Sequence, residues 1–207
     1  MAPEVKIRFG FELVVGLVAA IGTNLESAVS AISDQLRAFN YEIVPLRLSE
    51  LAEVEAKRLG VKIKNAPESD RIRTHMNAGD KLRERYGDDW LVQRAIAEIS
   101  RWRGSRRAPR EKIAYIVRSL KHPKEVETLR RVYGPGFFLI SLFSTENERF
   151  EYLTKTMRCS EVATRKLGGT LKKRQILTDK GHETHLRLGM CLFTLVLIGF
   201  RKSCVNF

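Results

Sequence analysis

The sequence predicts an α/β fold: an open, mostly parallel β-sheet with helices on both of its faces. Short apolar runs rich in β-branched residues occur at least four times, as expected of strands that are buried on both faces. Segments with apolar residues at helical spacing separate these runs, and that alternation favours parallel strand pairing. The chain has 207 residues, of which 43% are hydrophobic and 29% charged, and this composition is typical of a globular protein.

The first three expected elements form a βαβ unit. FELVVGLVAA predicts a buried strand, and a turn with a glycine follows it. Asn24 stands where a helix N-cap belongs, and the next segment has apolar residues at helical spacing as far as Phe39. Asn40 ends this helix, and Tyr41–Leu46 predicts the second strand. A strand, a glycine turn, a helix and a second strand in this order are typical of a βαβ unit.

A helical, charged middle separates this unit from two further strands. The spacing of apolar residues predicts helices over Leu48–Leu59, Asp70–Tyr86 and Leu91–Trp102. KIAYIVRSL and FFLISLF predict the next two buried strands. A helix over Pro123–Tyr133 lies between them, with proline at the start, where it is tolerated. A last helix is expected over Glu146–Met157.

Composition divides the chain into two parts. Residues 1–160 carry the strand and helix pattern and predict one domain. Residues 161–207 are basic and weakly periodic and predict an irregular tail, and the abrupt change near Leu188 favours a truncated or frame-shifted product. The apolar run Met190–Phe200 is shorter than the roughly 18–20 residues of a membrane span, so no membrane association is expected. Three scattered cysteines favour a cytoplasmic protein with reduced thiols.

The turn after the first expected strand has features of a phosphate-binding loop. In GLVAAIGTNLE, Gly16 and Gly22 let the backbone approach a ligand, and Thr23 and Asn24 can add hydrogen bonds where the helix begins. Alignment on the phosphate loops of nucleotide kinases places Leu25 at the lysine that normally neutralises the β- and γ-phosphates. Backbone amides and the positive end of the helix dipole can bind phosphate without it. A tight turn without a ligand is the alternative interpretation.

Two other strand ends carry candidate residues, because ligands of open parallel sheets lie beyond the carboxyl ends of the strands. Arg118 and Ser119 close the third expected strand, where nucleotide kinases often carry an aspartate that helps to hold Mg²⁺. An arginine there suits an anion and argues against Mg²⁺. Arg149, at the start of the helix after the fourth strand, resembles the lid arginines of nucleotide kinases. Each of these residues could instead belong to an ordinary solvated surface.

The net charge of +13 favours polyanionic partners. RWRGSRRAPREK brings six cations together and suits contact with a nucleic-acid backbone. Only Trp102 is interleaved with them, so base stacking has little support. The histidines and cysteines show no spacing that is typical of a zinc site, although His182 and His185 lie three residues apart.

Three stretches together resemble a known family. GLVAAIGTNLE, HMNAGDKLRERYGDD and IVRSLKHPKEVETLRRVYGPGFFLI are similar to the N-terminal half of the anti-phage dCTP/dCMP deaminases, over roughly residues 11–160. That family joins a nucleotide-kinase-like P-loop domain to a zinc-dependent cytidine-deaminase domain. The resemblance implies that residues 1–160 form the P-loop domain, and that zinc is expected only in a complete family member. The deaminase pattern H-x-E…P-C-x-x-C is missing from this chain.

These observations predict a nucleotide-binding, regulatory domain without deaminase chemistry of its own. The expected ligand is a nucleotide of the dCTP, dTTP or ATP class, and a homo-oligomer is compatible with the sequence. No catalytic residue is assigned. A small nucleotide kinase and a basic nucleic-acid-binding protein are the alternatives, and Leu25 argues against the kinase. The predicted nucleotide-binding residues are Gly16, Gly22, Thr23, Asn24, Arg118, Ser119 and Arg149.

Overall fold

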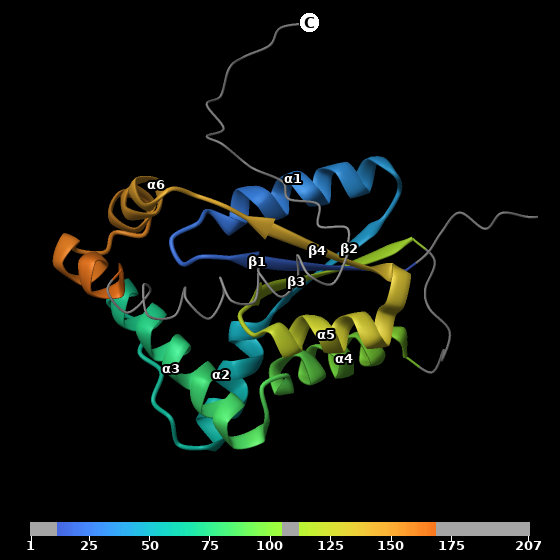
Figure 1. Ribbon diagram of the computed structural model, residues 1–207, viewed down its shortest axis with the longest axis horizontal. Coiled ribbons are helices and arrows are strands. Elements are labelled where there is room, and N and C mark those ends of the chain that lie inside the picture. Colours follow the sequence, from blue (N-terminus) through green and yellow to red (C-terminus); the bar gives the residue numbers. More distant parts are fainter. Residues whose placement is uncertain (1–11, 105–111, 169–207) are drawn as a thin grey trace, which may run out of the picture.

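A computed structural model describes residues 12–104 and 112–168 (Figure 1). Its centre is a sheet of four strands in the order β2-β3-β1-β4. Every neighbouring pair in this sheet is parallel, which confirms the predicted α/β class. The strands are β1 (Leu13–Ala19), β2 (Glu42–Arg47), β3 (Ile113–Leu120) and β4 (Phe137–Leu142).

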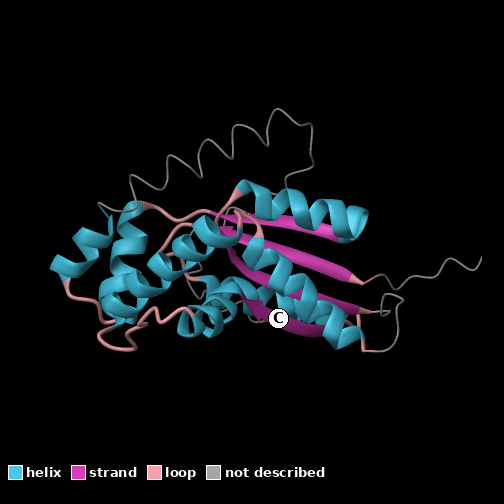
Figure 2. Cartoon of the chain, turned by 90° about the horizontal axis from the view of Figure 1, so that it is seen from below, coloured by secondary structure: helices cyan, strands magenta, loops and turns pink. Residues whose placement is uncertain are grey.

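Helices cover both faces of the sheet, as the sequence predicts. Helix α1 (Leu25–Ala38) packs on one face, where its apolar residues meet Val15 and Leu17 of β1. Helices α2 (Leu48–Arg58), α4 (Trp90–Arg103) and α5 (Pro123–Tyr133) contribute to the larger core on the opposite face. Figure 1 shows α1 above the sheet and α4 and α5 below it. Figure 2 shows the same layers from a perpendicular direction.

The alternation along β1 explains the two layers. Val14 belongs to the core shared with α4 and α5, whereas Val15 and Leu17 belong to the core under α1. Successive side chains of a strand point to opposite faces, so a central strand without polar residues can serve two cores. A continuous apolar run is therefore the sequence signal of this strand.

The remaining helices lie at one end of the sheet. Helix α3 (Glu68–Tyr86) follows α2, and α6 (Glu146–Glu151) follows β4. Helix α6 is shorter than the predicted Glu146–Met157 because the chain changes to a π-helix over Tyr152–Thr156. No helix within the described residues has the length and apolarity to cross a membrane.

The structure differs from two expectations about organisation. Gly16 lies inside β1 and not in the turn that follows it. Residues 161–168 are helical, although an irregular tail was expected from residue 161 onward. Thr164 and Leu167 of this segment are buried, so packing stabilises a helix that the sequence pattern signals only weakly. The rest of the predicted tail, residues 169–207, lies outside the described residues.

Gly16 is needed for close packing in the middle of the sheet. A Cβ atom at this position would lie 2.7 Å from Leu120 Cδ1 and 2.9 Å from Phe137 Cε2. Gly16→Ala is therefore expected to lower the free energy of unfolding by about 1–3 kcal/mol, as overpacking of a core does. Urea denaturation followed by circular dichroism measures this change.

The matched control is Gly168→Ala. A Cβ atom at Gly168 would meet nothing within 4 Å, and the residue is helical. This substitution should leave stability unchanged or raise it slightly, since alanine favours a helix over glycine. Equal losses in the two variants would contradict the packing role of Gly16.

Candidate functional site

The position between the carboxyl ends of β1 and β3, here named the crevice, is singled out by the topology of the sheet. From β1 the chain crosses through α1 to β2, which lies beyond β3. From β3 it crosses through α5 to β4, which lies on the other side of β1. Two adjacent strands whose connections leave in opposite directions form a topological switch point, where open α/β sheets bind their ligands.

The loop from Ala20 to Asn24 forms one side of this crevice. Gly22 has φ +85°, and a Cβ atom there would lie 2.9 Å from the backbone oxygen of Arg149. Only glycine satisfies both the left-handed backbone and the close approach of α6. The loop is therefore a tight strand-to-helix turn that ends directly at the N-terminus of α1.

The two polar residues of the loop have different surroundings. Asn24 caps α1: its Oδ1 accepts a hydrogen bond from the Ser27 amide at 3.2 Å, and its Nδ2 donates to Ser27 Oγ at 2.8 Å. Thr23 Oγ1 is buried and has no hydrogen-bond partner within the described part of the chain. The Asn24 side chain thus caps the helix, whereas the Thr23 hydroxyl is buried without a hydrogen-bond partner among the described residues.

A β-bulge shapes the other side of the crevice. Gly16 pairs with Val117 and Val18 pairs with Leu120, so Arg118 and Ser119 together oppose a single residue of β1. Ser119 has a backbone φ of +69°, a value that residues other than glycine rarely adopt. Bulges redirect side chains at the ends of strands, and backbone strain of this kind concentrates at functional sites.

Arg118 extends from the bulge to the first turn of α1. Arg118 Nη2 donates to Glu26 Oε1 at 2.6 Å, and the arginine side chain is only 8% exposed. Arg47 Nη2, from the end of β2, lies 3.2 Å from the same oxygen. The hydrogen bond from Arg118 is the main cause that holds the pKa of Glu26 below its ordinary value. The anion that Arg118 holds in this structure is therefore a carboxylate of the chain itself.

Lys121 reaches the same crevice from the connection between β3 and α5. Its Nζ donates to the backbone oxygen of Ala19 at 2.7 Å, where β1 ends and the loop begins. The backbone amides of Lys121 and His122 donate to Glu125 Oε2 at 2.7 Å and 3.0 Å. Sequence reasoning did not select Lys121, although a cation that directly follows a buried strand was a signal available to it.

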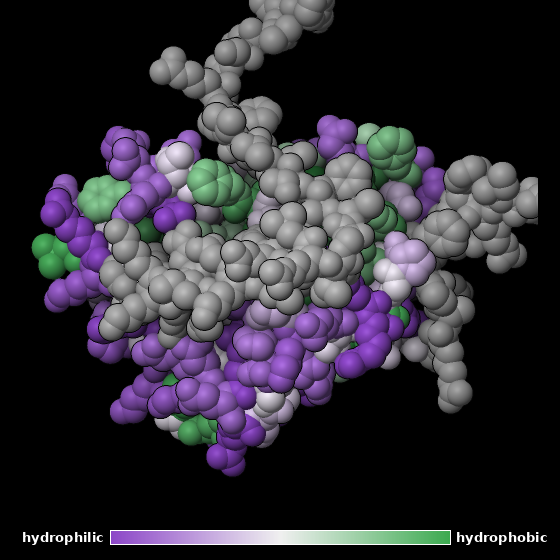
Figure 3. Space-filling model, viewed as in Figure 1, coloured by the Kyte–Doolittle hydropathy of each residue, from purple (hydrophilic) through white to green (hydrophobic). Residues whose placement is uncertain are grey.

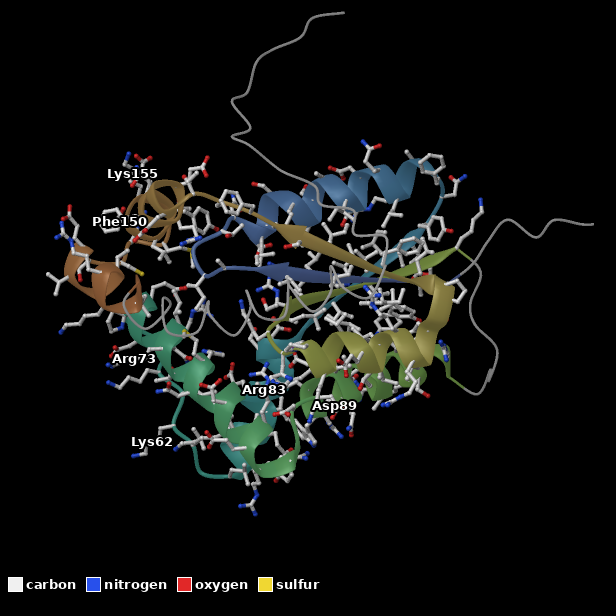
Figure 4. All side chains as sticks on the ribbon, in the orientation of Figure 1. Lys62, Arg73, Arg83, Asp89, Phe150 and Lys155 are labelled. Carbon is white, nitrogen blue, oxygen red and sulfur yellow. The ribbon has the colours of Figure 1, made fainter. Side chains whose placement is uncertain are left out.

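Glu125 is completely buried and joins α3 to this connection. Arg83 of α3 donates to Glu125 Oε1 through Nε at 3.1 Å and through Nη2 at 2.8 Å. Figure 4 shows Arg83 between α3 and the start of α5. The carboxylate therefore accepts four hydrogen bonds, which is the condition under which a buried charge is tolerated.

Helix α6 and the π-helix after it lie against the loop. Arg149 contacts Gly22 through its backbone oxygen, while its Nη1 donates to the Ser144 backbone oxygen at 3.1 Å. Burial raises the pKa of Tyr152, and the charges of Glu26 and Arg118 also act on this hydroxyl. The side chain of Arg149 is thus turned toward its own connection, whereas Tyr152 lies near the ion pair.

The structure therefore brings together most of the predicted site residues. Gly22, Thr23 and Asn24 belong to the loop, and the backbone oxygen of Arg149 lies against it. Arg118 and Ser119 form the bulge, from which Arg118 reaches Glu26 of α1. Gly16 is separated from them because it packs inside the sheet. The sequence prediction omitted Glu26, Lys121 and Tyr152 from the site.

The structure describes part of two other regions considered in the sequence, the basic segment that begins at the end of α4 and the candidate metal ligands. In the basic segment, Arg103 Nε donates to Glu12 Oε2 at 3.0 Å and Arg101 pairs with Glu98, whereas residues 105–111 lie outside the described part. In Figure 3 the surface over α3, α4 and α5 is mainly hydrophilic. Within residues 12–104 and 112–168, no three His, Cys, Asp or Glu side chains are grouped to hold a metal ion. His182 and His185 lie outside these ranges.

An open hollow of about 570 Å³ lies elsewhere, between the segment after α2 and the outer side of α3. Lys62, Asp80, Lys81 and Glu84 contribute mixed charges to it. None of the residues that line this hollow belongs to the loop, the bulge or α6. The crevice at the strand ends, which combines a glycine turn and the N-terminus of α1 with cations, is the better candidate for a functional site.

Comparisons with known proteins give distant likenesses. No family model matches the sequence. A UPF0200 protein of Methanothermobacter thermautotrophicus is 32% identical over 78 residues, which are 38% of this chain and 36% of that protein. The match thus spans about a third of the relative's length.

Solved structures also show similarity at low identity. TT1252 from Thermus thermophilus is 15% identical, with 92% of this chain and 91% of that chain covered and a TM-score of 0.47. A gluconokinase from Sinorhizobium meliloti is 14% identical, with coverage of 78% and 76% and a TM-score of 0.39. A shikimate kinase from Acinetobacter baumannii is 12% identical, with coverage of 94% and 87% and a TM-score of 0.40. None of these likenesses assigns a function to the chain.

The pair of Glu26 and Arg118 predicts a pH dependence of stability. Because the folded-state pKa of Glu26 is below the ordinary value of 4.5, its stabilising effect is present above pH 4.5 and is lost as the pH falls through the lowered pKa. Glu26→Gln should therefore flatten the fall in stability below pH 4.5. Urea midpoints measured between pH 3 and pH 7 test this, with about half-unit steps.

Glu50→Gln is the control for that series. Glu50 contacts Arg47 at 3.6 Å, and its side chain is 67% exposed, so its charge contributes little to folding. The Glu50 variant should retain the wild-type pH profile. A wild-type profile in Glu26→Gln as well would show that the ion pair with Arg118 does not stabilise the fold.

The buried carboxylate of Glu125 predicts a large effect on stability. Glu125→Ala removes the two close hydrogen bonds of the Arg83 guanidinium, which is 12% exposed and keeps Asp80 at 3.7 Å, and it removes the acceptor of two backbone amides. Breaking a buried pair in this way costs about 3–5 kcal/mol of unfolding free energy. Glu127→Ala, an exposed position on the same helix, should change stability by no more than about 0.5 kcal/mol. Similar losses in both variants would contradict this role.

Proposed function

We propose that the chain binds a nucleotide through its phosphates in the crevice between the ends of β1 and β3. The observation that carries the proposal is the convergence of a glycine turn, a helix N-terminus and two cationic side chains at a topological switch point. Amides at the start of a helix and the positive end of its dipole favour a bound phosphate. The cations are Arg118 and Lys121.

A second feature of the loop supports a polar ligand. Thr23 Oγ1 is buried and lacks a partner within the described residues, and native proteins rarely leave such a hydroxyl unsatisfied. A phosphate oxygen beside the loop would accept its hydrogen bond. An ordinary tight turn gives no reason to bury a hydroxyl at this point.

The charges at the site favour binding without phosphoryl transfer. Kinases bring Mg²⁺ to the phosphates through carboxylates and place a lysine in the loop. Here the carboxylate in the first turn of α1, Glu26, is held by Arg118 and Arg47, and Leu25 replaces the lysine. The proposed role is therefore regulatory: the nucleotide stabilises one state of the protein and is not consumed.

The identity of the nucleotide and its setting are finer parts of the proposal. The resemblance of residues 11–160 to the anti-phage dCTP/dCMP deaminases suggests a deoxynucleotide that controls a deaminase domain. The scattered cysteines favour a reducing, cytoplasmic setting. Both points rest on the sequence.

A thermal-shift panel of dCTP, dCMP, dTTP, ATP and GTP tests the proposal. A ligand at 100 times its Kd adds about 2.7 kcal/mol, which for a domain of this size raises the Tm by about 5–10 °C. No shift with any of these nucleotides at millimolar concentration would contradict nucleotide binding.

Two glycine variants link the shift to the crevice. Gly22→Ala strains a left-handed backbone and places a Cβ atom against α6, whereas Gly60→Ala strains a similar backbone with nothing within 4 Å. The Gly22 variant should lose the nucleotide-dependent shift, and the Gly60 variant should keep it. Loss in both variants, or in neither, would place binding elsewhere.

Two assays separate the alternatives. ATP-dependent phosphorylation of a deoxynucleoside monophosphate would favour a small kinase over a regulatory site. Preference for a polynucleotide over mononucleotides, with affinity that falls steeply with salt, would favour nucleic-acid binding.

A further inference from the structure

The loop between β1 and α1 lacks a lysine of its own, but a lysine from another part of the chain lies beside it. Lys121 Nζ donates to the backbone oxygen of Ala19 at 2.7 Å. Ala19 is the last residue of β1 and directly precedes the loop. The two residues are 102 positions apart in the sequence, so only the parallel pairing of β1 with β3 brings them together.

The backbone around Lys121 is fixed by buried interactions. Its amide and that of His122 donate to Glu125, which is completely buried and also holds Arg83. The bulge at Arg118 and Ser119 sets the direction in which the chain leaves β3. The backbone from which the Lys121 side chain starts is therefore held in place next to the loop.

Three of the cations near the strand ends, Arg118, Arg149 and Lys121, differ in their exposure to solvent. Arg118 is 8% exposed and is held by Glu26. Arg149 is half-buried, and its guanidinium donates to the backbone oxygen of Ser144. Lys121 is exposed, and its amine lies at the first residue before the loop. Its position therefore suits contact with an anion that enters from solvent.

We propose that Lys121 is the phosphate-binding amine of this site, supplied from the connection after β3 in place of the lysine that the loop lacks at Leu25. An ammonium group binds phosphate as a compact point charge. The position of the amine in the structure therefore matters more than the position of the lysine in the sequence. The inference rests on the proposed nucleotide function, and it assigns a residue to the binding of the terminal phosphates.

Isothermal titration of dCTP and dCMP into two variants tests the assignment. Lys121→Ala should weaken dCTP binding by about 10- to 100-fold, which is the value of a charge-assisted hydrogen bond. The loss for dCMP should be smaller, because fewer phosphates reach the amine. Lys124→Ala is the control: it removes the same charge three residues further along, in the first turn of α5, where this lysine pairs with Asp88 at 3.0 Å.

The outcomes separate the two proposals. Weaker dCTP binding in the Lys121 variant alone would support the assignment. Wild-type affinity in both variants would overturn it and leave nucleotide binding intact. Equal losses in both variants would overturn it in favour of general electrostatic attraction. If the wild-type protein binds neither nucleotide, both proposals fail together.

A second measurement uses the unaltered protein and does not depend on the folding of a variant. Lysines are acetylated with a water-soluble amine reagent, with and without dCTP, and quantified by mass spectrometry. Bound dCTP should slow the modification of Lys121 by at least about 5-fold and leave Lys124 unchanged, since a charge-assisted contact shields the amine. Equal modification of Lys121 with and without bound dCTP would overturn the proposal.

Discussion

The carboxylate of Glu125 accepts hydrogen bonds from the Arg83 guanidinium and from the amides of Lys121 and His122, and the geometry of the crevice depends on it. This one group fixes α3 against α5 and holds the chain as it leaves β3. It also completes the capping box at the start of α5, with His122 as the N-cap. A buried charge is tolerated only when its hydrogen bonds are made. Helix α3, the connection after β3 and the start of α5 must therefore take up their positions around this carboxylate together.

The parallel pairing of β1 and β3 converts that local arrangement into a site. The bulge lies at the carboxyl ends of the two strands, and it sends Arg118 toward α1 while the chain continues to Lys121 near Ala19. One strand end thus supplies two cations near the loop, Arg118 at Glu26 of α1 and Lys121 at Ala19 of β1. Ser119 carries the backbone strain of this turn, which the sheet on one side and the Glu125 contacts on the other both enforce.

Much of the fold could be predicted from sequence because it depends on local patterns. Apolar runs identify the strands, and Asn24 and Pro123 mark helix starts, as the structure has them. Gly16 was misplaced in the turn because a glycine that makes room for Phe137 has the same sequence signal as one that bends the backbone. The helix at residues 161–168 was missed because its stability comes from tertiary packing.

The site was harder to predict than the fold because its contacts are distant in sequence. The glycine loop and the strand-end arginine follow from position within the α/β pattern. The pairing of Arg118 with Glu26 spans 92 residues, and that of Lys121 with Ala19 spans 102. A single sequence contains no signal for either contact. Without them, Arg118 was expected to meet an external anion, whereas an internal carboxylate holds it.

That internal carboxylate has a consequence for any ligand. Glu26 occupies the first turn of α1, where the helix dipole attracts negative charge, and its side chain is 59% exposed. A phosphate that approaches the same amides must share the positive field of Arg118 and Arg47 with a carboxylate already in place. The proposed binding of a phosphate therefore needs a cation besides Arg118 and Arg47, and Lys121, whose Nζ donates to the Ala19 backbone oxygen at the end of β1, is the one that we assign. This division of charge favours the proposed reversible binding of an anion over phosphoryl transfer, because Arg118 and Arg47 hold the carboxylate of Glu26 that could otherwise bring Mg²⁺ to α1.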